Sequence, residues 1–413
     1  MLDQAPAADQ TIREVERKTF LARIDSLLPE IHARADETER LGRVPDDIVR
    51  ALAEVGVFRA LQPRQWGGLE LHHATFYEGM IRIASACAST GWVASVVGVH
   101  PWQIGLFADA AQRDMWAEDP DARASSSFAP TGVVMRVDGG FRLAGRWHFS
   151  SGVDHCGWVL LGGIVPDDGN GAESGGAEFR TFLVPRRDFT IDQDSWLVTG
   201  LAGTGSKDVV MEGAVVPEHR THRVVDYYNG TNPGFAVNDR PYFRLPWRLV
   251  FGNTIAAPAI GAAAGALDAF IQNNSTRVSA YGGAAAARNP ALHRPLARAL
   301  TEVNAARSRV HATWTDLTAR VDAGEAIPYE HRARCFYELT YAHASCSGAV
   351  YDLMGVNGVR TMRIDSPLQR FFRDLLAMRN HPAANIEFSA SLYAQASLGL
   401  EPPAFVPTQR YVL

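Results

Sequence analysis

The sequence Trp147-His-Phe-Ser-Ser-Gly-Val-Asp-His-Cys-Gly-Trp-Val-Leu-Leu-Gly162 lies in the central part of the chain, in a region of short extended runs. Between about Arg123 and His222, runs rich in β-branched and aromatic residues are separated by turn residues: Gly140-Phe-Arg-Leu, Trp158-Val-Leu-Leu, Thr181-Phe-Leu-Val and Val209-Val-Met. This spacing predicts the strands of a small antiparallel β domain.

Helical spacing lies on both sides of this region. From Ile12 to about Ala117, apolar residues recur three and four positions apart, as in Phe20, Ile24 and Leu27. After about Leu245 the spacing returns in stretches of several turns, which are typical of long antiparallel helices: Ile255–Gln272, Leu292–Val321, Tyr329–Leu353 and Ser366–Leu398. We therefore predict an α+β protein with an N-terminal helical domain (1–120), a central β-barrel-like domain (121–228) and a C-terminal four-helix bundle with a tail (229–413).

Composition excludes several classes of protein. Of the 413 residues, 46% are hydrophobic and 21% are charged, which is ordinary for a globular protein. The net charge of -5 comes without a dominant basic block, which argues against nucleic acid as a partner. The first residues lack the basic and apolar runs of a signal peptide, and no stretch reaches about 18 uninterrupted apolar residues, so we expect a cytoplasmic protein with no membrane contact. The four cysteines lack the spacing of metal ligands, and no metal site is expected.

The order of helices, strands and helices resembles the acyl-CoA dehydrogenase fold from about Arg17 to Leu400. Three strings resemble the monooxygenase branch of that superfamily, which includes 4-hydroxyphenylacetate 3-hydroxylase and secosteroid-phenol hydroxylase. They are the Trp147–Gly162 segment; Gly200-Leu-Ala-Gly-Thr-Gly-Ser-Lys-Asp-Val with the later Val215-Val-Pro-Glu-His-Arg; and Ser366-Pro-Leu-Gln-Arg-Phe-Phe-Arg-Asp with the later Arg379-Asn-His-Pro.

The resemblance implies the oxygenase component of a two-component, group D flavin monooxygenase. Such a protein takes reduced FMN or FAD from a separate NAD(P)H:flavin reductase. With O2 it forms a flavin C4a-hydroperoxide that hydroxylates a small aromatic substrate, either phenolic or indolic and polycyclic. The chain has no GxGxxG sequence after a strand, which agrees with delivery of the flavin by another protein. The resemblance also implies a homotetramer or a homodimer.

Ser150 and Ser151 are the first candidate residues for this chemistry. The flavin hydroperoxide survives only where water is excluded and the flavin N5–H is held by a hydrogen bond. By the resemblance, one of the two serine hydroxyls faces N5, and we favour Ser151. The alternative is a hydroxyl bonded to a neighbouring strand or turn.

His381 is the most informative single residue. At about this distance after Arg373-Asp374, the acyl-CoA dehydrogenases place a catalytic carboxylate, whereas this chain reads Ala377-Met-Arg-Asn-His-Pro. An imidazole with an ordinary pKa of about 6.5 suits deprotonating or orienting a phenol near neutral pH. The alternative is a helix-terminal histidine that caps carbonyl groups before Pro382.

Four further residues are candidates around the substrate. His100 lies where this branch positions a residue against the substrate, and we expect it to be a second hydrogen-bond partner of the substrate hydroxyl; a turn residue before Pro101 is the alternative. Trp102, Phe128 and Trp147 are candidate walls of an apolar pocket, with Trp147 also a candidate flavin contact. Large aromatic residues are otherwise residues of the core.

The resemblance also implies residues that bind the flavin. Arg277 loosely matches an arginine that this superfamily directs to the cofactor phosphate, often across a subunit boundary. The other candidates are polar or cationic residues of the three strings and of the Ala124–Pro130 segment: Ser126, Thr204, Ser206, Arg370 and Arg373. For the arginines, pairing with acidic residues on a helix surface is the alternative.

Three other functions remain open at this point. A strict acyl-CoA dehydrogenase would keep a carboxylate where His381 stands. Oxygenation of sulfur or nitrogen in a heteroaromatic compound would use the same flavin chemistry. A non-catalytic flavin-binding or scaffold protein would have no need of the pair Ser151 and His381.

Overall fold

The computed structural model describes residues 7–166, 177–278 and 285–401, and the side chains from residue 14 onward. Six helices precede the strands: α1 (Ala7–Ala33), α2 (Ala35–Leu41), α3 (Asp46–Glu54), α4 (His73–Ala86), α5 (Ala88–Ile104) and α6 (Asp109–Trp116). The strands are β1 (Ala124–Ser127), β2 (Val133–Val137), β3 (Gly140–Ser150), β4 (Trp158–Val165), β5 (Glu178–Pro185), β6 (Thr190–Asp192), β7 (Lys207–Pro217) and β8 (Thr221–Arg223). The helices that follow are α7 (Val224–Asn229), α8 (Trp247–Thr276), α9 (Pro290–Asp322), α10 (Tyr329–Asn357), α11 (Pro367–Arg379) and α12 (Ile386–Ser397).

The strands form two four-stranded sheets, with the orders β1-β4-β5-β8 and β2-β3-β7-β6. All four runs that the sequence predicted as strands lie in them, within β3, β4, β5 and β7. Alternate apolar residues such as Phe141, Leu143, Val159 and Phe182 point between the sheets and form a core of their own. The antiparallel prediction is wrong at one place, because β1 pairs with β4 in parallel.

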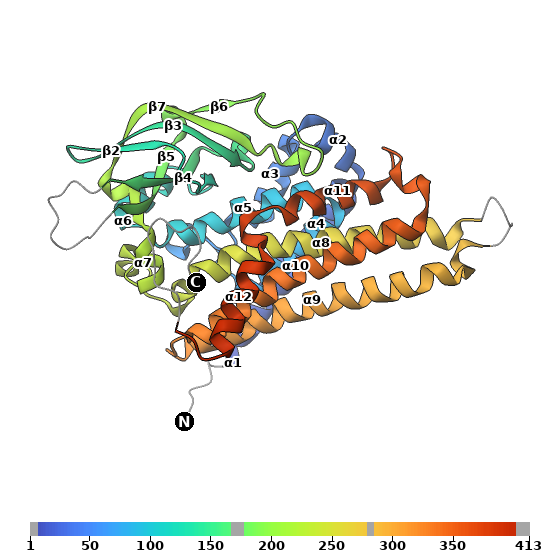
Figure 1. Cartoon of the computed structure of the whole chain (residues 1–413). Coiled ribbons are helices and arrows are strands. Elements are labelled where there is room, and N and C mark those ends of the chain that lie inside the picture. Colours follow the sequence, from blue (N-terminus) through green and yellow to red (C-terminus); the bar gives the residue numbers. More distant parts are fainter. Residues whose placement is uncertain (1–6, 167–176, 279–284, 402–413) are drawn as a thin grey trace.

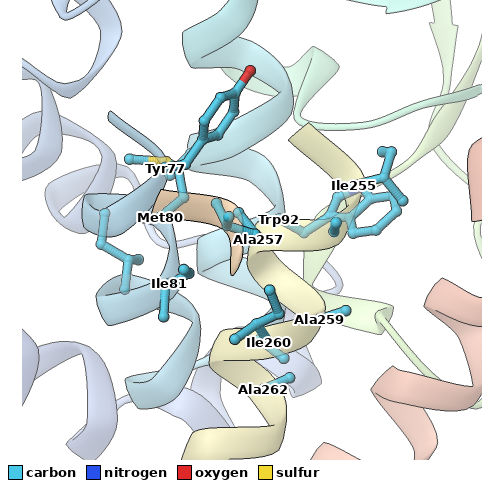
Figure 2. Close-up of a cluster of buried hydrophobic side chains, with 14 of the residues drawn as sticks. Tyr77, Met80, Ile81, Trp92, Ile255, Ala257, Ala259, Ile260 and Ala262 are labelled. Atoms are coloured by element: carbon cyan, nitrogen blue, oxygen red, sulfur yellow. The ribbon is translucent and has the colours of Figure 1, made fainter. Parts of the chain in front are cut away.

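Helix α8 joins the first and last thirds of the chain, since it packs against α4 and α5 as well as α10 and α11. Figure 2 shows Ile260 and Ala257 of α8 facing Met80 and Ile81 of α4. Small residues allow this close contact: a Cβ added to Gly261 would lie 2.2 Å from the carbonyl oxygen of Ile81. Helix α8 is long and apolar enough to cross a membrane, but 78% of its most apolar window is buried inside the protein.

Helix α5 lies beneath the β domain and above the long helices (Figure 1). It contacts α4, α8, α11 and β1, and nearly all of its residues are buried. Because every face of α5 is covered, its sequence is apolar and rich in small residues all round, rather than amphipathic.

The predicted helix Ser366–Leu398 is divided in the structure into α11, a short 3-10 turn (Pro382–Ala384) and α12. His381 has φ -69° and ψ 136°, an extended conformation that a residue before proline favours. The division therefore places His381 at a corner between two helices.

Gly261 gives a direct test of the packing between α4 and α8. We expect Gly261→Ala to lower the free energy of unfolding by about 1–3 kcal/mol, because the added methyl group overlaps the backbone of α4. Gly348, in α10, has no heavy atom within 4 Å of its added Cβ. Gly348→Ala is the matched control and should retain or raise stability, since alanine favours the helix. Urea unfolding of both variants makes the measurement, and equal stability would contradict this account of the contact.

Candidate active site

Four side chains form a continuous hydrogen-bonded chain, here called the hydroxyl chain: Trp92, Ser151, Ser206 and Thr204. The indole Nε1–H of Trp92 donates to Ser151 Oγ at 3.0 Å. Ser151 Oγ lies 2.7 Å from Ser206 Oγ, which lies 2.7 Å from Thr204 Oγ1. Thr204 Oγ1 donates to the carbonyl oxygen of Leu201 at 2.7 Å. The structure therefore links three predicted cofactor residues, with Ser206 bonded to both Ser151 and Thr204.

The backbone around the hydroxyl chain is held in unusual conformations. Ser151 comes directly after β3 and before Gly152, whose φ of 70° lies in the left-handed region. The backbone N–H of Gly152 donates to the carbonyl oxygen of Thr204 at 2.9 Å, which fixes the two loops against each other. Leu201 has φ 57°, a conformation that is costly for a leucine and needs support from its surroundings.

Asp374 supplies that support from α11. Its carboxylate accepts a hydrogen bond from the backbone N–H of Leu201 at 2.5 Å. The side chain is almost completely buried, and this burial raises the pKa of Asp374 to about 7, although the hydrogen bond from Leu201 acts in the opposite direction. Asp374 thus fixes the loop that carries Thr204 and Ser206.

His381 lies against the ring of Trp92. The two rings meet edge to face with their centroids 5.6 Å apart. The backbone N–H of Ala383 donates to His381 Nδ1 at 3.1 Å, so the proton of the neutral imidazole is on Nε2. Burial and, to a smaller extent, the charge of Arg248 together lower the pKa of His381 to about 4. His381 is therefore neutral at physiological pH and presents an N–H donor; it caps an N–H group of the following turn, not the carbonyl groups of the alternative interpretation.

His100 has the opposite arrangement of its ring nitrogens. Its Nδ1 lies 3.3 Å from Gln103 Oε1, which can only accept, so Nδ1 carries the proton. Gln103 is held in turn by Tyr227, because its amide donates to the Tyr227 hydroxyl at 2.9 Å. Burial lowers the pKa of His100 to about 3. His100 Nε2 is left as a buried acceptor with no hydrogen-bond partner in the described part of the chain.

Half-buried aromatic rings surround His100. Phe128 and Phe251 lie with their ring centroids 6.0 Å and 5.8 Å from the imidazole. Trp247 stacks on Phe251 at 4.5 Å and meets Phe128 edge to face at 5.9 Å. Phe128 comes from the segment after β1, whereas Trp247 and Phe251 belong to α8. We call these three residues the aromatic wall.

Comparison with known proteins identifies the family of the chain. Residues 16–119 and 253–386 match the family models of the N-terminal and C-terminal domains of acyl-CoA dehydrogenases. The chain is 41% identical over 381 residues to the flavin-dependent monooxygenase oxygenase subunit HsaA of Rhodococcus jostii, covering 92% of this chain and 98% of that protein. It is 34% identical to the oxygenase component of p-hydroxyphenylacetate 3-hydroxylase of Acinetobacter baumannii, covering 94% and 91%. The chain belongs to the oxygenase subunits of flavin-dependent monooxygenases.

A solved structure supports the same conclusion. The 3-HSA hydroxylase of Rhodococcus sp. RHA1 superposes on this oxygenase with a TM-score of 0.89 at 40% identity, covering 94% of this chain and 98% of the other. The predicted fold class and the predicted family are both confirmed. An oxygenase subunit of this kind depends on flavin and works with a separate component that reduces it.

Several predicted residues of the oxygenase lie away from the hydroxyl chain. Trp147 is completely buried between the two sheets, where its indole donates to the carbonyl oxygen of Gly162 at 2.8 Å. Trp102 is also completely buried, and its indole donates to the carbonyl oxygen of Tyr242 at 3.2 Å. Both are residues of the core and not walls of a pocket in this structure.

The two neighbouring serines also differ from Ser151. The hydroxyl of Ser150 is buried and donates to Ser125 Oγ at 2.9 Å. Ser126 is half-buried on β1 and points to the opposite face of the strand from Ser125. A role of Ser126 at the edge of the flavin stays a prediction.

Two of the three predicted arginines pair with acidic residues of the same chain, as in the alternative interpretation. Arg370 pairs with Asp36 of α2, and Arg373 pairs with Glu39 of α2 at 2.6 Å. Arg277 follows the last residue of α8, where it donates to the carbonyl oxygen of Asn357 at 3.2 Å. The 30 residues of α8 span about 45 Å, so Arg277 lies at the opposite end of the bundle from Trp247 (Figure 1).

Trp92, Trp247 and Phe251 are site residues that the sequence did not reveal. The signal for Trp92 was weak, since it is one large residue among small ones in Ser89-Thr-Gly-Trp-Val-Ala. Such a pattern indicates tight packing, which is true of Trp92, but it says nothing about a hydrogen bond to Ser151. Figure 2 shows Trp92 beside Ile255 of α8 in that packing.

Asp374 gives the oxygenase a defined pH dependence. Because its pKa is raised to about 7, the folded protein keeps a proton that the unfolded chain releases above pH ~4. The contribution of Asp374 to the free energy of unfolding is therefore lost as pH rises from about 4 to about 7, and it is constant above that. Asp374→Asn removes the titration and retains an oxygen acceptor for Leu201.

We expect the stability of Asp374→Asn relative to wild type to increase over this pH range, by at most ~1.4 kcal/mol per pH unit. Urea unfolding at about pH 4.5, 6 and 8 gives the measurement. Subtracting the wild-type curve cancels the titration of the buried histidines. A difference that does not change with pH would contradict the raised pKa.

Proposed function

We propose that this oxygenase hydroxylates a phenolic or related aromatic substrate, using O2 and reduced flavin. The observation that carries the proposal is the position of Trp92, which donates to the hydroxyl of Ser151 and meets the ring of His381 edge to face. One indole thereby joins a flavin-facing hydroxyl and a substrate-facing imidazole. The named relatives support the substrate class, because one of them is a p-hydroxyphenylacetate 3-hydroxylase.

Ser151 is the residue of this chain that would hold the flavin at N5. It is half-buried, so its hydroxyl can reach a ligand, whereas Thr204 and Ser206 are buried behind it. When bound, reduced flavin supplies the two electrons with which O2 yields one oxygen atom for the substrate and one molecule of water. The contribution of Ser151 is a hydrogen bond that fixes the edge of the ring system while water is excluded.

The two histidines suit a phenol because their hydrogen-bonding directions are complementary. His381 Nε2–H donates to the phenol oxygen, and the phenol O–H donates to His100 Nε2. The low pKa of each imidazole keeps both neutral, so this arrangement is present at physiological pH. The orienting role of His381 is favoured over a role as a base, because its Nδ1 is already occupied by Ala383. The hydrogen bond that the phenol O–H donates to neutral His100 Nε2 increases the electron density of the ring at the carbon to be hydroxylated.

The aromatic wall completes the proposed substrate site. Phe128, Trp247 and Phe251 are half-buried and offer ring faces and edges to an aromatic ligand. Oxygenation of sulfur or nitrogen would use the same wall but would not need the donor and acceptor pair of histidines. The phenol is therefore the substrate class that uses all of these groups.

The position of Arg277 supports a homo-oligomer. Within its own chain Arg277 lies 22 residues, and therefore about 33 Å, along α8 from Ile255. Ile255 lies beside Trp92, the hydrogen-bond partner of Ser151, so we expect Arg277 to reach a flavin phosphate of another subunit. We therefore keep the homotetramer or homodimer, with a separate NAD(P)H:flavin reductase as the partner that supplies reduced FMN or FAD. A cytoplasmic location stays a prediction from the sequence.

Ser151→Ala tests the proposed flavin contact. We expect the yield of hydroxylated product per reduced flavin to fall about tenfold and H2O2 to rise correspondingly, because a hydrogen bond at the ring edge is lost. Ser195→Ala is the matched control, since Ser195 Oγ also makes two hydrogen bonds but lies outside the hydroxyl chain. If Ser150→Ala uncouples the reaction and Ser151→Ala does not, the flavin faces Ser150 instead.

His381→Ala tests the proposed substrate contact. We expect hydroxylation of a phenol to fall about a hundredfold, since a group that positions the reacting hydroxyl is lost, while binding of reduced flavin is retained. His311→Ala, at an exposed histidine of α9, is the control. Product analysis with purified protein, chemically reduced flavin and air makes the measurement. Full hydroxylation by His381→Ala would exclude the proposed role.

A further inference from the structure

The hydroxyl chain has a direction that is fixed at both ends. An indole Nε1–H can only donate, so Ser151 accepts from Trp92. A carbonyl oxygen can only accept, so Thr204 donates to Leu201. The two hydroxyl contacts between these ends, Ser151 with Ser206 and Ser206 with Thr204, have no direction of their own.

The hydrogen bond from Thr204 to the Leu201 carbonyl oxygen determines the direction of every hydrogen bond in the hydroxyl chain. If Thr204 pointed its proton at Ser206, two oxygen atoms would face each other at 2.7 Å with no proton between them. Because Thr204 has one proton and uses it on Leu201, Ser206 must donate to Thr204. Ser206 has then used its own proton, and Ser151 must donate to Ser206.

The surroundings prevent this direction from reversing easily. Thr204 is 1% exposed and Ser206 is 4% exposed, so water has little access to their hydroxyl groups. The acceptor at the end is also fixed, since the Leu201 N–H is held by Asp374 at 2.5 Å. In addition, the indole N–H of Trp196 donates to the Leu201 carbonyl oxygen at 3.2 Å.

We propose that the hydroxyl chain makes Ser151 an acceptor only, and that this lets the oxygenase select reduced over oxidised flavin. Ser151 uses its proton on Ser206 and one lone pair on Trp92, which leaves one lone pair for a ligand. Reduced flavin carries a hydrogen on N5 and can donate to that lone pair. Oxidised flavin has a lone pair on N5, so two acceptors would face each other.

The inference rests on the proposed function, because it takes Ser151 as the residue that faces N5. It assigns Trp92, Ser206 and Thr204 as positioning residues, which act on the flavin through Ser151. Such selection has a clear use: an oxygenase that receives flavin from a separate component must bind the reduced form in the presence of the oxidised form. It must also release the oxidised form after each turnover.

Ser206→Ala tests the inference by binding alone. The variant removes the acceptor for the Ser151 proton, which becomes free to donate to oxidised N5. We measure Kd for oxidised FMN in air and for dithionite-reduced FMN under anaerobic conditions, with wild type and variant. The ratio of the two constants, oxidised over reduced, should fall about tenfold in Ser206→Ala, the size of effect expected for one buried hydrogen bond.

Three further variants separate an effect on hydrogen-bond direction from an effect on structure. Thr204→Val removes the last hydroxyl group of the hydroxyl chain and should lower the ratio of oxidised to reduced Kd. Thr204→Ser keeps a hydroxyl group at this position and should leave the ratio unchanged. Ser195→Ala, which deletes a hydroxyl group outside the chain, should also retain it. A loss of affinity that is equal for both forms of FMN would show a merely structural role and would overturn the inference.

The wild-type measurement separates the two proposals. If wild type binds neither form of FMN nor either form of FAD, the proposed flavin site fails. If wild type binds reduced FMN but shows no preference over oxidised FMN, the inference fails while the site stands. An unchanged ratio of the two Kd values in Ser206→Ala and Thr204→Val would also contradict the inference and leave the proposed flavin site in place.

Discussion

The burial of α5 on every side is the constraint on which the rest of the structure depends. The helix contacts α4, α8, α11 and β1, so its position is set by close packing and not by a ligand. Trp92 and His100 are both carried by α5, eight residues and therefore about 12 Å apart along its axis. Ser151, the proposed flavin contact, and the aromatic wall are thus placed relative to one rigid element.

The chemistry of the site is set by hydrogen-bonding directions as much as by residue types. Ala383 makes His381 a donor, Gln103 leaves His100 an acceptor, and Trp92 together with Ser206 makes Ser151 an acceptor. In each case the donor or acceptor role of the side chain is fixed by a neighbouring group that is buried or belongs to the backbone. Burial lowers the pKa of both histidines, which keeps these directions constant across the physiological pH range.

The sequence was sufficient for the fold and for part of the site. Apolar periodicity predicted the long helices and the runs in β3, β4, β5 and β7, because core-facing residues must repeat with the geometry of the element. The resemblance supplied Ser151, Thr204 and Ser206 as separate candidates. Their hydrogen bonds depend on the packing of the segment after β3 against the segment before β7, which the sequence does not reveal. The pairing of Arg370 with Asp36 was not predictable, since any of many acidic residues distant in sequence could have met it. The corner at His381 follows from Pro382, although the extended helical spacing concealed it.

Phe128 and Phe251, two of the three residues of the aromatic wall, differ from the rest of the site in one respect that bears on the evolution of such enzymes. Phe128 and Phe251 have side chains without polar atoms, so neither takes part in the networks that orient Ser151, His100 and His381. Exchanging them for other apolar residues would reshape the space for a substrate and leave the direction of every catalytic hydrogen bond unchanged. A protein with this fold can therefore acquire new substrates through a few apolar substitutions in the aromatic wall, while the reaction with oxygen stays the same.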